Sequence, residues 1–427
     1  MSIISIFCFL IASLILISCF RRGSDVFSPA RVFLFVWAIA IGLTDLKFSR
    51  LQHQWENYAW ISLLLSVGSF LIGIFIVQVL FIRQGSYSVG TIRKIILNEK
   101  INHVMLYRLI TGLFILYVMV YIIEWISYGT LPLFAAFPDR ARSEIPITGL
   151  HLFIGAMPII LFLILEYYIL VRAQNIQKLI LAIYFLITLL SYLFFLNRLY
   201  YVLFFIMALG FMYYASRHVR IRNILISLTI LIGLMVFLQY FRETRYVENF
   251  LYVVSEMKYS SEYAVFTGPY MYVVMNLENF ARAVVRLENF TYGYFSLDFL
   301  MALSGLKHWL SSYFGLQERV FLVSGYNTFP FFWDYYYDFG LLGLAFLSCL
   351  LGVFTSILHV YMRLKPSIVS ISMYSMMLFV VIFSFFTNAL TSLNFVFNFV
   401  LLFVSQRMIL RKRITNLHSF SDGTRND

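Results

Sequence analysis

The sequence has few charged residues and few cysteines, and both shortages limit the class of protein it can encode. Asp, Glu, Lys and Arg make up 12% of the 427 residues, about half of the roughly 25% that is usual in soluble domains. This small number of charged groups cannot cover the surface of a water-soluble protein of this length. The composition therefore indicates a lipid environment. The three cysteines, Cys8, Cys19 and Cys349, all lie in apolar runs, which excludes a disulfide framework and a paired-cysteine metal site.

The chain also lacks the short motifs of several enzyme classes. It contains no GxxxxGK[ST] phosphate-binding loop, no His and Cys spacing typical of zinc sites, and no GxSxG nucleophile elbow. We therefore expect no nucleotide-driven motor, no metal site and no cofactor. The net charge is +12, from 32 Lys and Arg against 20 Asp and Glu. Because these basic residues are scattered between apolar runs, we expect no nucleic-acid partner.

Apolar residues are what the chain has in excess, at 61% of its length. A helix needs about 20 mostly apolar residues to cross a hydrocarbon core of roughly 30 Å. Eleven segments have this character and predict an all-α polytopic membrane protein with about 11 transmembrane helices. The predicted spans are 2–20, 30–46, 58–82, 104–126, 148–171, 178–196, 199–215, 223–240, 339–361, 368–386 and 389–408.

The distribution of basic residues predicts how these spans are oriented. Every second connection carries Lys or Arg and the short connections between them carry few, which is the pattern expected when the basic loops face the cytoplasm. The basic connections are 21–29, 83–103, 172–177, 216–222, 362–367 and the tail 411–427. We therefore predict an outer N-terminus, a cytoplasmic C-terminus, and contact between the basic loops and anionic membrane lipids.

One connection, residues 241–338, is much longer than the others. It holds 10 of the 20 acidic residues and 7 of the 32 basic ones, and the predicted topology places it outside. Apolar residues recur at helical spacing within 274–290, which predicts an amphipathic helix along the membrane surface. The predicted organisation is an N-terminal bundle of about eight spans (1–240), this large outer loop, a bundle of about three spans (339–410) and a cytoplasmic tail (411–427).

The end of this loop combines acidic and aromatic residues in an unusual way. Asp334 and Asp338 are four residues apart, directly before a predicted span. If a helix begins here, both carboxylates share one face, and both are candidates for a catalytic base. Aromatic faces and amides also suit sugars. The glycan-binding candidates are Tyr326, Asn327, Trp333 and Tyr337. The alternative is an interfacial belt, in which Tyr and Trp anchor a helix at headgroup level.

Several arginines lie on the predicted outer side, where few basic residues are expected. Arginine binds phosphate oxygens bidentately and keeps its charge, so arginines at the outer membrane edge would suit a lipid diphosphate. The diphosphate-binding candidates are Arg198, Arg242, Arg245 and Arg140. The alternative is snorkelling to ordinary lipid headgroups or pairing with nearby glutamates. His308 is a weaker candidate, because a lone histidine is more often structural.

The size, the topology and two motifs resemble the Wzy-type O-antigen polymerases of the oligosaccharide repeat-unit polymerase family. Asn197-Arg198 resembles the Gly/Asn-Arg hairpin that is common in that family. Asn327-Thr328, followed by the run 336–343 (YYDFGLLG), resembles its Asn-Thr plus Tyr-x-Asp-Phe-Gly-x-x-Gly segment. The resemblance in topology covers the whole chain, whereas the resemblance in motifs covers about twenty residues.

This resemblance implies a metal-independent glycosyltransferase-type reaction on the periplasmic face of the bacterial inner membrane. A growing glycan would leave its undecaprenyl diphosphate and be transferred to the non-reducing end of an incoming lipid-linked unit. Arg198 would stabilise the charge that develops on the diphosphate, and Asp338 or Asp334 would accept the proton of the attacking hydroxyl. The implied partners are the undecaprenyl-diphosphate oligosaccharide and a chain-length regulator protein of the same pathway.

Two other functions agree with much of the same sequence. An O-antigen ligase has a similar topology and leaving group but a different acceptor. A flippase for lipid-linked oligosaccharides is the non-enzymatic alternative, and it predicts internal repeats, polar residues in the middle of the membrane and short loops. The long outer loop and the scarcity of charge within the spans favour an enzyme.

Overall fold

The structure is a computed structural model that describes residues 2–21, 23–81, 84–135, 149–171, 175–216, 245–287, 289–311, 321–323 and 325–410, besides a few single positions. In this part of the chain the secondary structure is helical, with two isolated backbone bridges and no strand. The predicted all-α fold is therefore confirmed there. The predicted tail, residues 411–427, and most of the predicted span 223–240 lie outside the described residues.

The helices of the N-terminal half follow the predicted spans closely. Their bounds are α1 (Ile3–Cys19), α2 (Pro29–Asp45), α3 (Asn57–Leu80), α4 (Val89–Leu97), α5 (His103–Tyr128), η1 (Pro132–Phe134), α7 (His151–Ile154), α8 (Met157–Leu170), α9 (Asn175–Leu193) and α10 (Leu199–Ala215). Local chemistry explains several ends. Pro29 begins α2, where its missing N–H leaves no helical bond unmade. Gly129 ends α5 with a φ of 73°, which glycine adopts at no steric cost.

The second half begins with short helices, which come from the predicted outer loop, and ends with long ones. Their bounds are α12 (Arg245–Val254), η2 (Ser261–Phe266), α13 (Thr267–Arg286), α14 (Asp298–Ser304), α15 (Leu306–Ser311), α16 (Trp333–Leu364), α17 (Ile368–Ile382), η3 (Ala389–Thr391) and α18 (Leu393–Ile409). Helix α13 contains most of the predicted amphipathic stretch. Helix α16 begins at Trp333 and not at the predicted residue 339, so the aromatic-acidic stretch is already helical.

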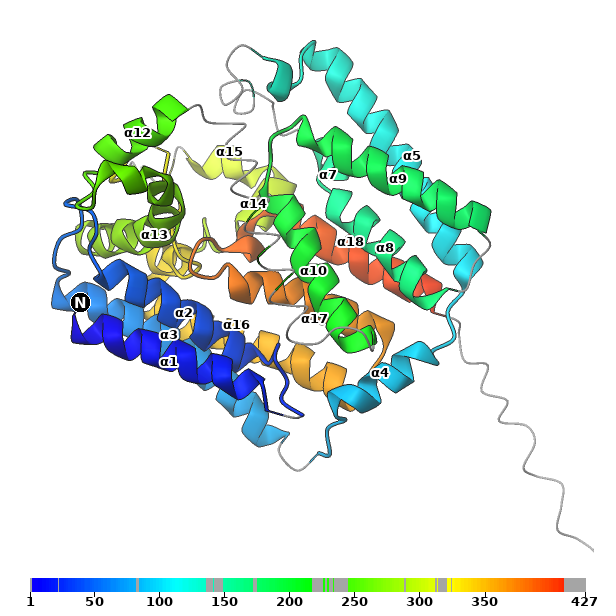
Figure 1. The fold of residues 1–427 in the computed structure, drawn as a ribbon, viewed down its shortest axis with the longest axis horizontal. Helices are drawn as coiled ribbons and strands as arrows, with labels where there is room; N and C mark the ends of the chain where they lie inside the picture. The colour runs from blue at the N-terminus through cyan, green and yellow to red at the C-terminus, as the bar shows by residue number, and fades with distance from the viewer. Residues whose placement is uncertain are drawn as a thin grey trace, which may run out of the picture.

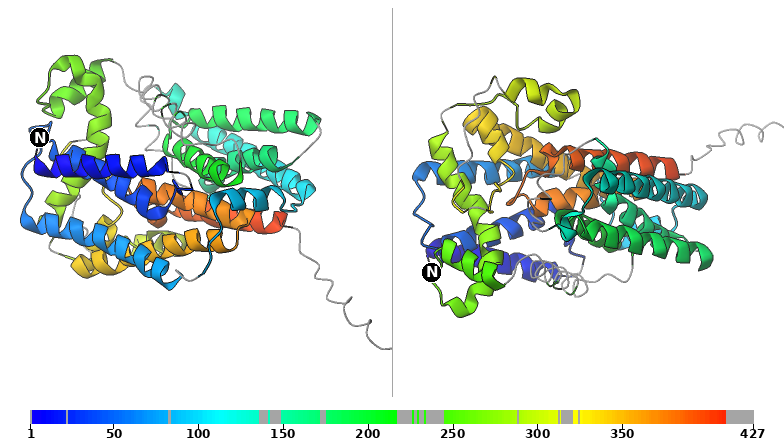
Figure 2. Two further views of the ribbon diagram at one scale, coloured as in Figure 1. Left: turned by 60° about the horizontal axis from the view of Figure 1, so that its bottom comes forward. Right: turned by 90° about the horizontal axis from the view of Figure 1, so that it is seen from above.

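Five helical segments in the described ranges are long and apolar enough to cross a membrane. They are α3, α5 with η1, α7 with α8, α9 and α16, and the shorter apolar helices are α1, α10, α17 and α18. The number of eleven spans stays a prediction, as does their orientation. Figures 1 and 2 show α12–α15 at one end of these helices, whereas α4 and the end of α18 lie at the other.

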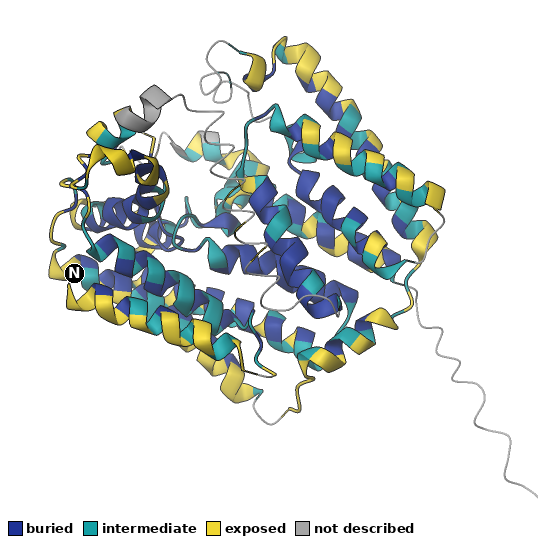
Figure 3. Ribbon diagram, viewed as in Figure 1, coloured by how far each residue is buried: buried dark blue, intermediate teal, exposed yellow. Residues whose placement is uncertain are grey.

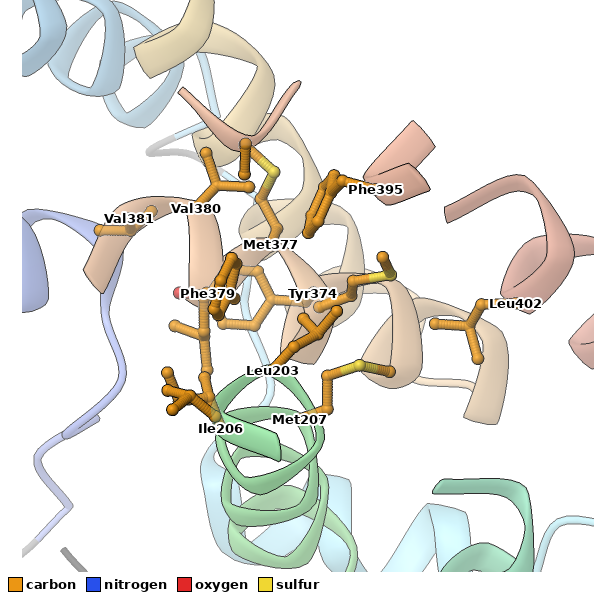
Figure 4. Packing of buried hydrophobic residues seen from close by; sticks show 14 of the residues in the cluster. Leu203, Ile206, Met207, Tyr374, Met377, Phe379, Val380, Val381, Phe395 and Leu402 are labelled. Atoms are coloured by element: carbon orange, nitrogen blue, oxygen red, sulfur yellow. The ribbon is translucent and has the colours of Figure 1, made fainter. Parts of the chain in front are cut away.

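The most deeply buried helices are α8, α10 and α17, at the centre of the molecule (Figure 3). Figure 4 shows Leu203 and Met207 of α10 close to Tyr374 and Met377 of α17. The peripheral helices α1, α3, α5 and α9 instead expose many large apolar side chains. Extended apolar faces of this kind are costly in water and favourable against lipid, which agrees with a membrane-embedded protein.

Helices α3 and α16 approach each other so closely that glycine is required at the contact. A Cβ atom added at Gly352 would lie 2.1 Å from the carbonyl oxygen of Phe70, and one added at Gly73 would lie 2.1 Å from that of Cys349. Neither backbone can move away alone, because each belongs to a long helix. Small residues at a membrane helix contact allow such backbone approach and increase van der Waals packing. This contact fixes the part of α16 around Gly352.

We predict that Gly352→Ala destabilises the protein by about 1 to 3 kcal/mol, the usual cost of forcing a methyl group into a filled contact. The matched control is Gly68→Ala, because Gly68 lies in α3 with nothing within 4 Å of an added Cβ. That control should be neutral or slightly stabilising. Thermal unfolding of both variants in detergent measures the difference, and equal midpoints would contradict the close contact.

Candidate functional site

A cavity of about 300 Å³ lies where three distant segments of the chain meet. One segment contains α14 and α15, one precedes and begins α16, and one is the turn between α17 and α18. The lining residues are Phe295, Asp298, Lys307, Asn327, Thr328, Phe329, Pro330, Trp333, Asp334, Thr387, Asn388 and Thr391. Carboxylate, amide and hydroxyl groups thus face one space beside aromatic rings. Of the predicted site residues, Asn327, Trp333 and Asp334 are among them.

Helix α13 holds the wall that precedes α16. The side-chain amide of Asn279 donates to the carbonyl oxygens of Tyr326 at 2.9 Å and Thr328 at 3.2 Å, and its oxygen accepts from the backbone N–H of Leu322. One turn earlier on α13, the Asn276 side chain accepts a hydrogen bond from the Thr328 hydroxyl. Two asparagines on one helix face therefore fix the path of the segment that carries Asn327.

Asp338 is a buried anchor for the opposite wall. Its carboxylate accepts hydrogen bonds from the Thr291 hydroxyl, from the backbone N–H of Phe295 at 3.2 Å and from the backbone N–H of Ser296. The side chain is completely buried. A carboxylate removed from water is stable only when donors replace its hydration, and these three groups do so. Asp338 thereby attaches residues 291–296 to α16.

The same attachment uses a break in α16 at Gly340, where φ is 60° and ψ is −145°. The break frees the carbonyl oxygens of Tyr337 and Asp338, which accept from the backbone N–H groups of Thr291 at 3.1 Å and Tyr292 at 3.2 Å. A Cβ atom added at Gly340 would lie 2.9 Å from the Phe290 ring. Glycine is thus required by the positive φ and by the close packing.

This geometry corrects the role expected for Asp338. It does not line the cavity, and its oxygens are already occupied by hydrogen bonds within the protein. It is therefore unsuited to accept a proton from a substrate. Asp334, one turn earlier and partly exposed, does line the cavity, and it accepts a hydrogen bond of 3.4 Å from the Thr391 hydroxyl.

The faces of Trp333 are not open to a sugar, contrary to the expectation of an aromatic platform. Phe329 stacks on Trp333 at 4.7 Å between ring centroids, and Tyr336 stacks on it at 6.0 Å. The residue is only 3% exposed, and its indole Nε1–H has no hydrogen-bond partner among the described residues. Trp333 therefore contributes to the cavity wall as part of a packed aromatic cluster, and its N–H is enclosed.

Asn388 was not predicted as a site residue, yet it is the other buried polar group at the cavity without a completed hydrogen bond. Its side chain is 6% exposed, and neither amide atom has a partner of normal geometry in the described ranges, although the Tyr335 hydroxyl lies beside it. Buried polar groups are rarely left unpaired in a protein interior. Asn388 and Trp333 are therefore part of the enclosed wall of the cavity, and Asn327, Asp334 and Thr391 supply polar groups to its lining.

The remaining predicted residues lie elsewhere. Tyr326 and Tyr337 are buried in aromatic contacts with Tyr272 and Phe295, and neither is part of the cavity lining. Arg198 directly precedes α10 and is partly exposed. It does not line the cavity, but Tyr200, two residues later, lies beside the Asn394 side chain on α18. Arg140 and Arg242 lie outside the described residues, as do the side chains of Arg245 and His308.

Charge at the cavity is nearly balanced. Lys307 and Asp298, both in its lining, form an ion pair of 2.6 Å. Because both side chains are partly exposed, this pair contributes little to stability. Asp334 is the second carboxylate of the lining. No three His, Cys, Asp or Glu side chains within the described ranges come close enough to hold a metal ion. Such a lining suits a neutral ligand rich in hydroxyl groups.

Glu278 attaches α13 to the connection between α2 and α3. Its carboxylate accepts from the side chains of Gln52 at 3.2 Å and Trp55 at 3.1 Å. Burial disfavours the charged form and raises the pKa of Glu278 to about 6, although these hydrogen bonds and Lys47 oppose the shift. The support of the cavity wall therefore contains a carboxyl group that titrates near neutral pH.

We predict that Glu278 makes stability depend on pH. Its pKa is higher in the folded state than its ordinary 4.5, so its contribution is fully present below pH 4.5 and is lost as pH rises through about 6, by about 2 kcal/mol. Glu278→Gln, which imitates the protonated group, should remove this loss. Unfolding midpoints of both proteins at several pH values measure it, and parallel curves would exclude the effect.

We also predict that Asp338→Asn lowers stability by about 1 to 3 kcal/mol, because it weakens three buried hydrogen bonds. Thr291→Val removes one of the same donors, so the double variant should lose less than the sum of the single losses. Asp334→Asn is the control and should change stability by less than about 0.5 kcal/mol. Additive losses in this cycle would show that Thr291 and Asp338 act independently.

Comparison of the chain with protein-family models, with curated protein sequences and with solved structures finds no match.

Proposed function

We propose that the protein is a polymerase of lipid-diphosphate-linked oligosaccharide repeat units, acting at the outer face of the bacterial inner membrane. The observation that carries this proposal is the cavity, because the amide of Asn327, the carboxylate of Asp334 and the hydroxyl of Thr391 in its lining suit the hydroxyls of a glycan. It lies among the segments that the predicted topology assigns to the outer side, at the end of apolar helices suited to lipid. This location brings a membrane-anchored glycan within reach.

In this proposal the cavity binds and orients the body of a glycan. Asp334, Thr391 and Asn327 hydrogen-bond hydroxyl groups of the glycan, while Trp333 and Asn388 form part of the wall. Holding the reacting sugar in place lowers the entropic barrier to transfer between two large substrates. The narrow, mostly polar lining agrees with one or two sugar rings rather than with a lipid chain.

The lipid diphosphate would bind at the start of α10. Arg198 directly precedes that helix, where the backbone N–H groups of the first turn and the guanidinium attract phosphate oxygens. The charge that develops on the departing diphosphate is stabilised there. Arg140, Arg242 and Arg245 stay proposed contributors on the basis of the sequence. A chain-length regulator protein is the proposed partner within the membrane.

The decisive experiment compares lipopolysaccharide from a strain that lacks the gene with that from complemented strains. A polymerase predicts a single repeat unit on the core in the deletion strain, whereas a ligase predicts core without any repeat. A flippase predicts lipid-linked units that accumulate on the inner side. The wild-type gene should restore long chains, and its failure to do so from a one-unit background would contradict the proposal.

Within that assay we predict that Asp334→Asn and Asn327→Ala shorten the glycan chains at equal protein levels. Each removes a hydrogen bond to the bound glycan, which corresponds to a loss of roughly tenfold or more in kcat/KM for a buried or charged partner. The matched control is Glu262→Gln, which neutralises an exposed carboxylate outside the cavity lining. Chains of normal length from both cavity variants would show that the cavity does not bind the substrate.

A further inference from the structure

A carboxylate–histidine pair lies on α5 and α7, away from the cavity lining. Glu124, near the end of α5, is 3% exposed, and its Oε2 is 2.9 Å from Nδ1 of His151 at the start of α7. Its other oxygen is buried and has no hydrogen-bond partner among the described residues. An acidic group buried within an apolar helix is costly, so its retention there favours a specific role.

The pair has the arrangement that prepares a histidine to act as a base. Because Glu124 can only accept at Nδ1 when ionised, it selects the tautomer with the proton on Nδ1 and a lone pair on Nε2. Nε2 has no partner in the described part of the chain, and the His151 side chain keeps 16% of its surface exposed. A buried carboxylate that holds Nδ1 also stabilises the imidazolium formed when Nε2 takes a proton.

The pair lies beside the hairpin that carries Arg198. The ring of Phe195, three residues before Arg198, packs edge-on against the His151 ring at 5.7 Å between centroids. The next turn of the chain packs against α18, whose first residues follow the cavity lining. The carbonyl oxygen of Gly155, one helical turn after His151, accepts a hydrogen bond from the Asn398 side chain. A Cβ atom added at Gly155 would lie 3.4 Å from the side-chain oxygen of Asn394. Thr391 of the cavity lining precedes Asn394 by three residues.

We propose that His151, positioned by Glu124, is the base that accepts the proton of the attacking sugar hydroxyl. The inference rests on the proposed polymerase function. The hydroxyl oxygen forms a bond to the anomeric carbon of the donor, while the bond from that carbon to the diphosphate breaks and its electron pair stays on the diphosphate oxygen. The hydroxyl proton moves to Nε2 of His151 and is later released to water, so charge and atoms balance.

The position of the donor explains why this base is His151 and not Asp334. The anomeric carbon is bonded to the diphosphate, so the group that removes the proton lies near the site of the diphosphate at Arg198. His151 packs against the hairpin of Arg198, whereas Asp334 lines the cavity that binds the body of the glycan. If the pair only held α5 and α7 together, the hydrogen bond at Nδ1 would be sufficient, and Nε2 would not need to be accessible.

The experiment uses the full-length protein in lipid nanodiscs with purified lipid-diphosphate-linked repeat units. The rates of wild type, His151→Gln, Glu124→Gln and Asp334→Asn are measured from about pH 5 to about pH 9, which brackets the titration of an imidazole. We expect His151→Gln to lower kcat about 100-fold or more and to remove the fall in rate at acid pH. Glu124→Gln should lower kcat at least about tenfold and keep that acid limb. Asp334→Asn should chiefly raise KM.

Chemical rescue separates a base from a structural residue. In His151→Ala, added imidazole should restore at least about a tenth of the lost rate, because a free imidazole can take the place of the missing ring and accept the proton. Tyr128, which also lies beside Glu124, provides a control, since Tyr128→Phe should keep both the rate and the pH profile.

Three outcomes would overturn the inference. If wild type elongates glycans and His151→Gln keeps most of its kcat and the acid limb, His151 is not the base, while the polymerase function stands. If Asp334→Asn abolishes kcat and removes the acid limb, Asp334 is the base. If purified wild type does not elongate lipid-linked units at all, the proposed function fails and the inference fails with it.

Discussion

The arrangement of the segments around the candidate site depends on one buried carboxylate. Asp338 replaces its lost hydration with a hydroxyl and two backbone N–H groups from residues 291–296. The break at Gly340 turns two helical carbonyl groups towards the same segment. Together these contacts fix the wall of α14 against the wall that begins α16. The cavity exists only because these two walls keep a constant separation.

A second set of contacts connects the walls of the cavity to the membrane helices. Glu278, Asn279 and Asn276 lie on one helix, α13, and together they bind two different connections. The glutamate reaches the segment after α2, and the asparagines reach the segment before α16. The close glycine contact between α3 and α16 fixes the part of α16 around Gly352. The candidate site is thus supported by α13 and α3, and neither helix contributes a residue to its lining.

Sequence reasoning predicted the helices well and the site in part. Apolar runs long enough to span a membrane leave little choice of secondary structure, so ten of the eleven predicted spans lie on helices. The spacing of Asp334 and Asp338 correctly predicted a helix, but it could not show that residues 291–296 enclose Asp338 whereas Asp334 lines the cavity. Asn388 and the Glu124–His151 pair are single polar residues in apolar stretches. Their partners or neighbours come from distant segments, which local patterns do not reveal.

The anchor at Asp338 constrains the backbone of the cavity wall and leaves its side chains free. Phe295 lines the cavity with its ring, yet it binds Asp338 only through its main-chain N–H, and Ser296 does the same. Almost any residue supplies an N–H group. The identity of the side chains that meet a ligand can therefore change by substitution without loss of the fold that presents them. One scaffold of this kind can present different sets of side chains to a ligand.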